Sequence, residues 1–328
     1  MFELIRPGTQ IDFVGKRRMW LGISFAAIII TIILFFTKGL NYGIDFTGGA
    51  EIQVKVPATW EIGRVRDELE KGGLKGPKVQ QIGLPADHTF LIKAQGDENS
   101  LNQTSKQVSE IFTKSLKAGE YEIQRVDVVG PAAGSSLRRD GFLSMLYALI
   151  CIMVYVTIRF DGRYSPGAVL ALLHDSVITL GVFIVLQKQF DLQILAAVLA
   201  LIGYSNNDTI IVYDRVRETV HQYPSLSISD AVNRAVNETL GRTILTSLCT
   251  FITVFSLWLL GGKVIEDFAF TLMVGIVVGT YSSIFIASSM VIWMTEYYKE
   301  RETKFKMSGG TAPKRKGVIV RPEPKFEA

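Results

Sequence analysis

The sequence predicts a membrane protein of six transmembrane α-helices, with one α+β domain between the first helix and the second. Three observations lead to this fold class. The apolar residues form six long runs, and the mean hydropathy of the 328 residues is +0.28. Most of the basic residues that flank these runs fall on one side of them. The segment 38–136, between the first two runs, has mixed strand and helix patterns instead.

The six runs have the length that a membrane span requires. A bilayer core about 30 Å thick is crossed by about 20 apolar residues in a helix. The sixth run is long enough to tilt or to project from the membrane. The predicted spans are 19–37, 141–158, 166–186, 192–213, 243–260 and 268–295.

The flanking charges predict the orientation of the chain. Lys and Arg are enriched in the cytoplasmic loops of membrane proteins. The basic clusters named below fall on one side of the spans, which places both termini in the cytoplasm. The cytoplasmic parts are then the segment 1–18, the loops after the second and fourth spans and the basic tail 296–328. The clusters outside the tail are Lys16, Arg17 and Arg18, then Arg159 and Arg163, and then Arg215 and Arg217.

The segment 38–136 is predicted to fold outside the cytoplasm as a ferredoxin-like α+β domain. Long translocated domains are exempt from the charge rule. Residues 50–56 alternate in polarity as a strand does, and apolar residues recur at helical spacing over 60–71. Two strands, a second helix and a last strand follow, at 79–82, 89–93, 101–116 and 121–129. The order β-α-β-β-α-β is that of the split βαβ motif.

The part 137–295 holds the other five spans and one further helix. Apolar residues lie at helical spacing over about 225–241, with Ser229 as a plausible N-cap and Gly241 beyond the end. We expect a separate amphipathic helix on the cytoplasmic surface.

The composition excludes other classes of protein. With 48% hydrophobic and 20% charged residues, the chain is neither disordered nor fibrous. Cys151 and Cys249 lie within apolar runs, where we expect buried side chains and no disulfide framework. The three histidines are scattered and no cysteine pair has metal-ligand spacing. We therefore expect no metal and no cofactor.

Asp208 is the acidic residue of a polar block in the fourth span. It lies about 9 Å along the helix from Asp214, which we place at the cytoplasmic edge. Ionisable residues at this depth are costly and mark functional candidates. Burial disfavours an ionised carboxylate and a nearby cation favours it, so Asp208 can exchange protons. A structural hydrogen bond is the alternative, but Asn or Ser would suffice for it. Asn207 and Thr209 flank Asp208 and are candidates to support it.

Three further ionisable residues lie within spans. Arg242 opens the fifth span on the same cytoplasmic half as Asp208, which it is placed to reach. Taken alone, Arg242 is better interpreted as an arginine that extends to the membrane interface. His174 and Asp175 lie near the middle of the third span. They either extend a polar relay or form a hydrogen bond between helices, and the sequence favours neither.

The motifs of this chain resemble those of the SecF family, within the resistance-nodulation-division superfamily. After the first span, a signature loop contains Gly43, Asp45, Phe46, Thr47, Gly48 and Gly49. Before the second span comes Val129-Gly130-Pro131, and the third holds His174-Asp175. The fourth reads Asn207-Asp208-Thr209, followed by Asp214-Arg215-Val216-Arg217-Glu218 and then Arg242-Thr243. Asn206 departs from the family pattern, in which an aliphatic residue is commoner.

The resemblance implies a function in protein export and a location in the bacterial inner membrane. It implies a SecD-like partner that supplies six further spans, and association with the SecYEG channel, YajC and YidC. The complex would use the proton gradient to assist late translocation of preproteins on which SecA has acted. Asp208 and Arg242 correspond to the proton-pathway residues, and protons would be the coupling ion. No bond is made or broken, so we expect no enzyme. We expect contact with membrane lipids and none with nucleic acid.

Two rival functions remain at this point. One is half of a proton-driven exporter of lipids or small molecules from the same superfamily, although such exporters normally carry both halves in one chain. The other is a passive assembly subunit whose buried charges are structural.

Overall fold

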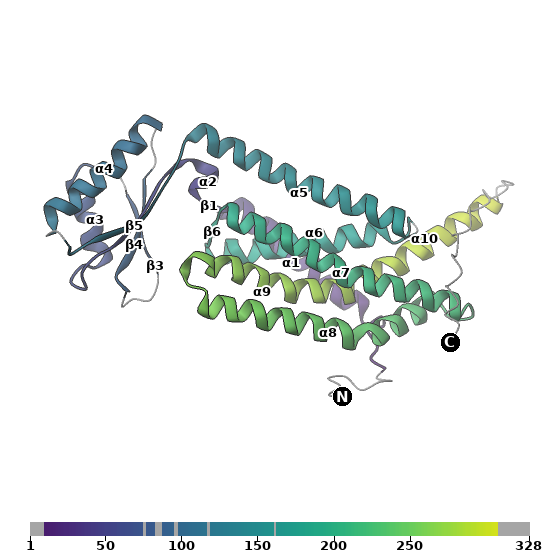
Figure 1. Ribbon diagram of the computed structural model, residues 1–328. Coiled ribbons are helices and arrows are strands. Elements are labelled where there is room, and N and C mark those ends of the chain that lie inside the picture. The colour runs from purple at the N-terminus through teal and green to yellow at the C-terminus, as the bar shows by residue number, and fades with distance from the viewer. Residues whose placement is uncertain are drawn as a thin grey trace, which may run out of the picture.

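The computed structural model describes residues 10–74, 77–82, 87–94, 98–116, 119–160 and 162–307. The chain forms a helical bundle with a sheet domain at one end (Figure 1). Within the described residues, six helices are long and apolar enough to cross a membrane, which is the number that the sequence predicts. The predicted tail beyond residue 307 and the first nine residues lie outside the described part.

The helices α6, α7 and α9 form the centre of the bundle. The helix α7 packs on α6, α8 and α9, and α9 also packs on α6 and α8. The helix α1 packs on α6, and α5 packs on α6 and α2. A π-helical turn, η2, joins α9 to α10. The bounds are α1 (Arg17–Thr37), α5 (Pro131–Arg159), α6 (Ser165–Leu186), α7 (Leu192–Gln222), α8 (Ile228–Leu260), α9 (Lys263–Ser282), η2 (Ser283–Ala287) and α10 (Ser288–Met307).

The prediction of a separate surface helix at about 225–241 is wrong. The helix α8 runs unbroken from Ile228 to Leu260 and includes the predicted fifth span. Its N-cap is Ser227, whose hydroxyl accepts a hydrogen bond from the Asp230 amide, and not Ser229. Gly241 lies inside the helix because a single glycine costs only about 1 kcal/mol there. The buried neighbours Leu240 and Thr243 keep the helix packed through this position.

The sheet domain has the element order that the sequence predicts. Its strands are all antiparallel to their neighbours and lie in the order β3-β4-β2-β5. The helices α3 and α4 cover one face, where Val65, Leu69 and Phe112 pack on Ile52 and Val54. The bounds are β2 (Gly49–Lys55), α3 (Ile62–Lys71), β3 (Lys78–Ile82), β4 (Thr89–Ala94), α4 (Glu98–Ser115) and β5 (Glu122–Val129).

A short joint connects the sheet domain to the bundle. It consists of β1 (Asn41–Tyr42), α2 (Ile44–Thr47) and β6 (Gln189–Phe190), the last directly before α7. The strands β1 and β6 pair in parallel, and the Gly43 amide donates to the Phe190 carbonyl at 2.7 Å. The rings of Phe46 and Phe190 stack with centroids 5.6 Å apart. The start of α7 is therefore in direct contact with the segment that leads into the sheet domain.

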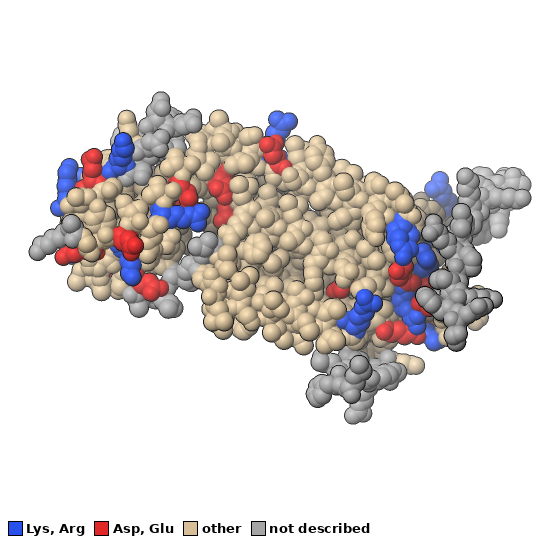
Figure 2. Space-filling view, viewed as in Figure 1, with Lys and Arg blue, Asp and Glu red and all other residues tan. Residues whose placement is uncertain are grey.

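The surface agrees with a membrane-embedded bundle. Figure 2 shows Lys, Arg, Asp and Glu gathered towards the two ends of the molecule, with a largely uncharged belt over the helices between them. Cys151 and Cys249 are exposed on this bundle, so the expectation of buried cysteines is wrong for the single chain. Both lie on helices that bury few of their side chains, α5 and α8.

Candidate functional site

Asp208 lies on α7 in the interior of the bundle. The residue is 1% exposed, and its Oδ2 atom accepts a hydrogen bond of 3.2 Å from the Ser247 hydroxyl of α8. The Ser247 oxygen in turn accepts a hydrogen bond of 2.8 Å from the Thr280 hydroxyl of α9. A chain of hydroxyl groups thus links the carboxylate to both neighbouring helices. Hydroxyls donate and accept equally well, so this chain suits either protonation state of Asp208.

Arg242 does not pair with Asp208 in this structure. Arg242 is exposed on α8, and it takes part in no ion pair within 4.0 Å among the described residues. Thr243 and Ser247, one turn apart, face the interior of the bundle. Arg242 precedes this stripe by one residue, which turns its side chain about 100° around the helix. The predicted direct contact is therefore absent, and Arg242 faces outwards on the same half of α8.

His174 and Asp175 form a second buried cluster. The His174 Nδ1 atom lies 3.0 Å from Asp175 Oδ1, and both side chains are at most 5% exposed. Asp175 Oδ2 accepts from the hydroxyls of Ser205 on α7, at 2.5 Å, and Ser282 on α9, at 2.8 Å. The contact therefore reaches two other helices, as the sequence interpretation of a bond between helices requires. It also extends the polar groups towards Asp208, so the relay interpretation stays open.

The other polar residues of α7 divide between the interior and the surface. Thr209 is fully buried, and its hydroxyl has no partner among the described residues; the same holds for the side-chain oxygen of Asn206. Asn207 is exposed on the bundle surface. Of the two residues that flank Asp208, only Thr209 therefore shares its buried environment.

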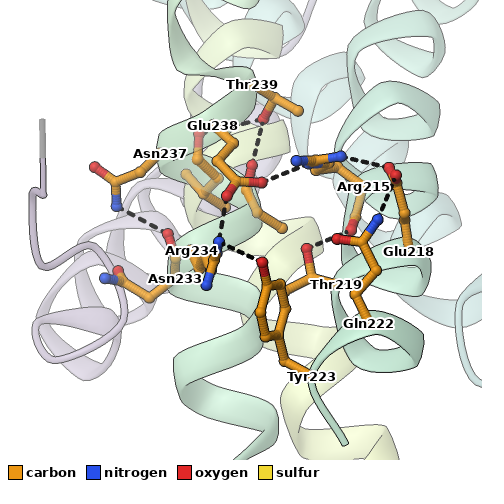
Figure 3. Close-up of polar contacts among 12 residues, drawn as sticks. Arg215, Glu218, Thr219, Gln222, Tyr223, Asn233, Arg234, Asn237, Glu238 and Thr239 are labelled. Carbon is orange, nitrogen blue, oxygen red and sulfur yellow. Dashed lines mark hydrogen bonds and ion pairs between the residues drawn. The ribbon is translucent and has the colours of Figure 1, made fainter. Parts of the chain in front are cut away.

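Beyond these clusters, a network of charged residues ties α7 to α8 at the end far from the sheet domain. Figure 3 shows Arg215 between Glu218 and Glu238, and Arg234 between Glu238 and Tyr223. The Arg215 contacts are each 2.5 Å, and the Arg234–Glu238 contact is 2.8 Å. Exposed pairs contribute about 0–1 kcal/mol each, so this network connects the two helices but adds little free energy of stabilisation. Asn233 and Asn237 of α8 also bind the chain segment before α1.

The signature loop caps the other end of α7. Asp45 Oδ2 accepts from the Leu192 amide at 3.0 Å, and the N-cap residue Asp191 accepts from the Ile194 amide at 2.9 Å. Burial raises the pKa of the Asp191 carboxyl, and the nearby charges of Asp45 and Asp267 raise it further. Each such cap satisfies an otherwise unpaired amide at a helix start. The helix that carries Asp208 is thus held at its first turn by the signature loop.

The rest of the signature loop makes close backbone contact with the start of α5. Gly43 donates to β6, Phe46 packs in the joint, and the Thr47 hydroxyl donates to the Gly43 carbonyl at 3.1 Å. Gly48 has φ +72°, and a Cβ atom there would lie 2.7 Å from the Pro131 Cα atom. Gly49 begins β2 with φ 143°. The loop therefore forms the structural core of the joint.

The hydroxyl partners of both carboxylates were missed at the sequence level. Ser205, Ser247, Thr280 and Ser282 lie in apolar runs where serine and threonine are common, so only the helix packing identifies them. The capping function of Asp45 depends on a contact between residues 147 positions apart. Among the described residues, no group of three or more His, Cys, Asp and Glu side chains is arranged to hold a metal ion.

Two family models match this chain. The model "Protein export membrane protein SecD/SecF, C-terminal" matches residues 107–297, and the model "SecD/SecF GG Motif" matches residues 33–56, which include the signature loop. Together with the six candidate spans, these matches define the chain as a multi-pass membrane protein of the SecD/SecF export class.

Comparison with individual relatives identifies the family. "Protein translocase subunit SecF" of Calditerrivibrio nitroreducens is 43% identical over 291 residues, covering 88% of this chain and 95% of the relative. The proteins of the same description from Magnetococcus marinus and Pseudomonas aeruginosa are 44% and 38% identical, over 89% and 88% of this chain and 94% and 93% of theirs. The chain belongs to the SecF family, which confirms the resemblance seen in its motifs.

Similarity to solved structures of SecDF agrees with this family assignment. The crystal structure of SecDF from Thermus thermophilus, described as a translocon-associated membrane protein, is 34% identical with a TM-score of 0.79 and covers 88% of this chain. A SecDF structure in a super-membrane-facing form is also 34% identical, with a TM-score of 0.67 over 93% of this chain. This chain spans 39% and 41% of the length of those two proteins.

Proposed function

We propose that this chain is a proton-coupled subunit of the protein-export machinery, in which Asp208 binds and releases the coupling proton. One observation carries the proposal: a carboxylate that is 1% exposed lies inside a candidate membrane helix, and its one hydrogen-bond partner among the described residues is the Ser247 hydroxyl. Ionisable residues inside membrane spans are costly, and where they occur they mark functional sites such as proton relays. Arg242 acts on Asp208 through space from the next helix.

The proposed route from proton to force runs along α7. Protonation of Asp208 changes the bonding between α7 and α8 and shifts the equilibrium between two packings of these helices. At its outer end, α7 is capped by Asp45 of the signature loop, at 3.0 Å. A shift of α7 therefore moves the joint and, with it, the ferredoxin-like sheet domain on the outer side of the membrane. Preprotein held by that domain would be pulled outwards, after SecA has acted and while the SecYEG channel is open, with YajC and YidC as further associates.

The proposed orientation places both termini in the cytoplasm. The charged network of Arg215 and Arg234 lies where α7 ends and α8 begins, and Arg17 at the start of α1 donates to the Ser229 hydroxyl of α8. Figure 1 shows this end of the bundle opposite the sheet domain. The rule that cytoplasmic loops are enriched in Lys and Arg supports this assignment.

The direct test measures export with and without a proton gradient. In vesicles that contain SecYEG, SecA and the complex of this chain with its SecD-like partner, we expect the gradient to accelerate the late part of preprotein transport. Vesicles that lack only this chain should lose that acceleration while the basal, ATP-driven transport continues. Equal gradient dependence with and without the chain would contradict the proposal and favour a passive assembly subunit.

The proposed SecD-like partner has a specific docking face on α7. Four exposed residues share one face of this helix at heptad spacing: Ala196, Ala200, Gly203 and Asn207. Nothing lies within 4 Å of a Cβ atom placed on Gly203. Small residues with one amide allow the close approach of another helix in a membrane. Exposed Arg242 on the adjacent α8 extends this face with a charge that a partner would shield.

We expect Gly203→Cys, carrying a thiol-linked photocrosslinker, to form an adduct with the SecD-like subunit in native membranes. The background carries Cys151→Ser and Cys249→Ser, because both native cysteines are exposed. The matched control is Phe36→Cys, an 82% exposed position on α1, which packs chiefly on α6 and away from α7. Mass spectrometry identifies the adducts. A SecD-like adduct of equal yield from both positions, or from the control alone, would place the partner elsewhere.

A further inference from the structure

Asp175 is a buried carboxylate that has no assigned function in the proposed proton pathway. Its side chain is 1% exposed, and three groups surround it: His174, Ser205 and Ser282. Within the described part of the chain, no Lys or Arg side chain lies within 4.0 Å of it. A purely structural contact would not need a charge here, because Asn or Gln can bond to two hydroxyls at a lower desolvation cost.

The hydroxyl groups around Asp175 can serve both of its protonation states. When Asp175 is ionised, Oδ2 accepts from Ser205 and Ser282, as the distances show. When a proton binds Oδ2, the new O–H group donates to the Ser282 oxygen. The Ser282 hydroxyl proton then turns to the carbonyl oxygen of Gly279, which lies 3.1 Å away. An acceptor is thus available for the displaced proton without any change in helix packing.

The Asp208 cluster has the same design. The Thr280 hydroxyl lies 2.8 Å from the Ser247 oxygen and also 2.8 Å from the carbonyl oxygen of Ile276. When Asp208 binds a proton and donates to Ser247, Ser247 can donate to Thr280, and Thr280 can turn to Ile276. The hydrogen bonds from each carboxylate therefore lead to a hydroxyl group of α9. That hydroxyl can donate either to a side-chain oxygen or to a backbone carbonyl of α9.

Both hydroxyls lie in one turn of α9, which is the meeting point of four other helices. Gly279 allows Ser205 of α7 to approach, since an added Cβ atom would lie 3.0 Å from it. Thr280 contacts α8, and the Tyr281 hydroxyl donates to the Trp20 carbonyl of α1 at 2.9 Å. Ser282 contacts Asp175 of α6.

The π-helical turn η2 begins at the next residue, Ser283. Single π-helical turns inside α-helices are rare, and those that occur are frequently found at functional sites. The turn 279–282 is therefore placed to pass a change of hydrogen bonding to a part of the helix that can change its register.

We propose that Asp175 is a second proton-exchanging carboxylate of this membrane domain, and that Ser282 and Thr280 report the states of Asp175 and Asp208 to η2. The inference rests on the proposed proton-coupled function. The ionisable groups that face the cluster are His174 on the same helix, Tyr281 on α9, whose ring centroid is 6.0 Å from that of His174, and Asp208, one turn from Ser205 on α7. From α1, the contacts are the Ser24 hydroxyl and the Trp20 carbonyl, and neither is charged.

Infrared difference spectroscopy tests this inference on the purified full chain in lipid vesicles. The carbonyl stretch of protonated carboxylic acids is followed between about pH 4 and pH 9, a range that covers buried carboxyl groups. We expect Asp175→Asn to remove one titrating component, Asp208→Asn to remove a different one, and the double variant to remove both. The matched control is Ser176→Ala, because Ser176 is also buried on α6 but donates only to the Leu172 carbonyl, at 2.9 Å. It should keep both components.

A spectrum of folded Asp175→Asn that equals the wild-type spectrum at every pH would overturn the inference. If this variant fails to fold, Ser282→Ala decides, since it keeps the carboxylate and removes one of its donors. Ser282→Ala should move the pH at which the Asp175 component titrates, and an unchanged midpoint would also overturn the inference.

Export measurements separate this inference from the proposed function. We expect Asp175→Asn and Asp208→Asn each to lose the acceleration by the gradient, and Asp175→Glu to recover part of it. If Asp208→Asn loses the acceleration and Asp175→Asn keeps it, the inference fails and the proposed function stands. If Asp208→Asn keeps it, the proposed function fails, and the spectra still decide whether Asp175 exchanges protons.

Discussion

Asp208→Asn should abolish the part of export that depends on the proton gradient, while the complex assembles normally. Asn has the same shape and can accept the hydrogen bond from Ser247, so the packing of α7 and α8 is kept. It cannot bind and release a proton. A potential of 100 mV supplies about 2.3 kcal/mol per charge that crosses the membrane, roughly a 50-fold bias on a two-state equilibrium. The variant loses this bias entirely, so transport in energised vesicles should fall to the rate without a gradient.

Asp214→Asn is the matched control for this experiment. Asp214 lies on the same helix, six residues or about 9 Å further along. Its side chain is 45% exposed, and it pairs with Arg159 at 3.4 Å. An exposed pair of this kind contributes at most about 1 kcal/mol, so Asp214→Asn should keep the gradient response. Asp208→Glu keeps an exchangeable proton and should retain part of it. The hypothesis is falsified if Asp208→Asn complexes, at normal abundance, keep full dependence on the gradient.

The features that depend on local pattern could be predicted from the sequence. The six long apolar helices and the strand and helix order of the sheet domain both follow from residue periodicity and run length. The signature loop was also found, because its glycines and Asp45 form a short contiguous motif. Its function was not, because Asp45 caps a helix that begins 147 residues later.

The errors at the sequence level concern features that packing decides. A glycine and a polar segment predict a break before Arg242, but α8 continues because buried residues on either side hold it. The predicted contact between Arg242 and Asp208 depends on the rotation of α8, which no pattern in the sequence fixes. The π-helical turn after Ser282 has no residue signature either. The contacts among hydroxyl groups in the interior of the bundle also depend on helix packing and have no signature in the sequence.

Gly48→Ala should destabilise the joint more than replacement of any other glycine of the signature loop by alanine. Gly48 has φ +72° and ψ 157°, a region that is essentially restricted to glycine and that costs about 1–3 kcal/mol for other residues. The new methyl group would also lie 2.7 Å from the Cα and 2.9 Å from the N atom of Pro131. These are backbone atoms, which cannot rotate away as a side chain would. Overpacking of this kind adds about 1–3 kcal/mol.

The thermal unfolding midpoint of the purified chain measures this effect, and Gly63→Ala provides the control. Gly63 lies in the first turn of α3 in the neighbouring sheet domain, and nothing lies within 4 Å of an added Cβ atom. Alanine is about 1 kcal/mol better than glycine in a helix, so Gly63→Ala should raise the midpoint slightly. Gly48→Ala should lower it clearly, because strain and overpacking act together. Since the joint links α7 to the sheet domain, export driven by the gradient should also fall, even at temperatures where the variant remains folded. A Gly48→Ala chain with the stability and the gradient response of wild type would show that force does not pass through this loop.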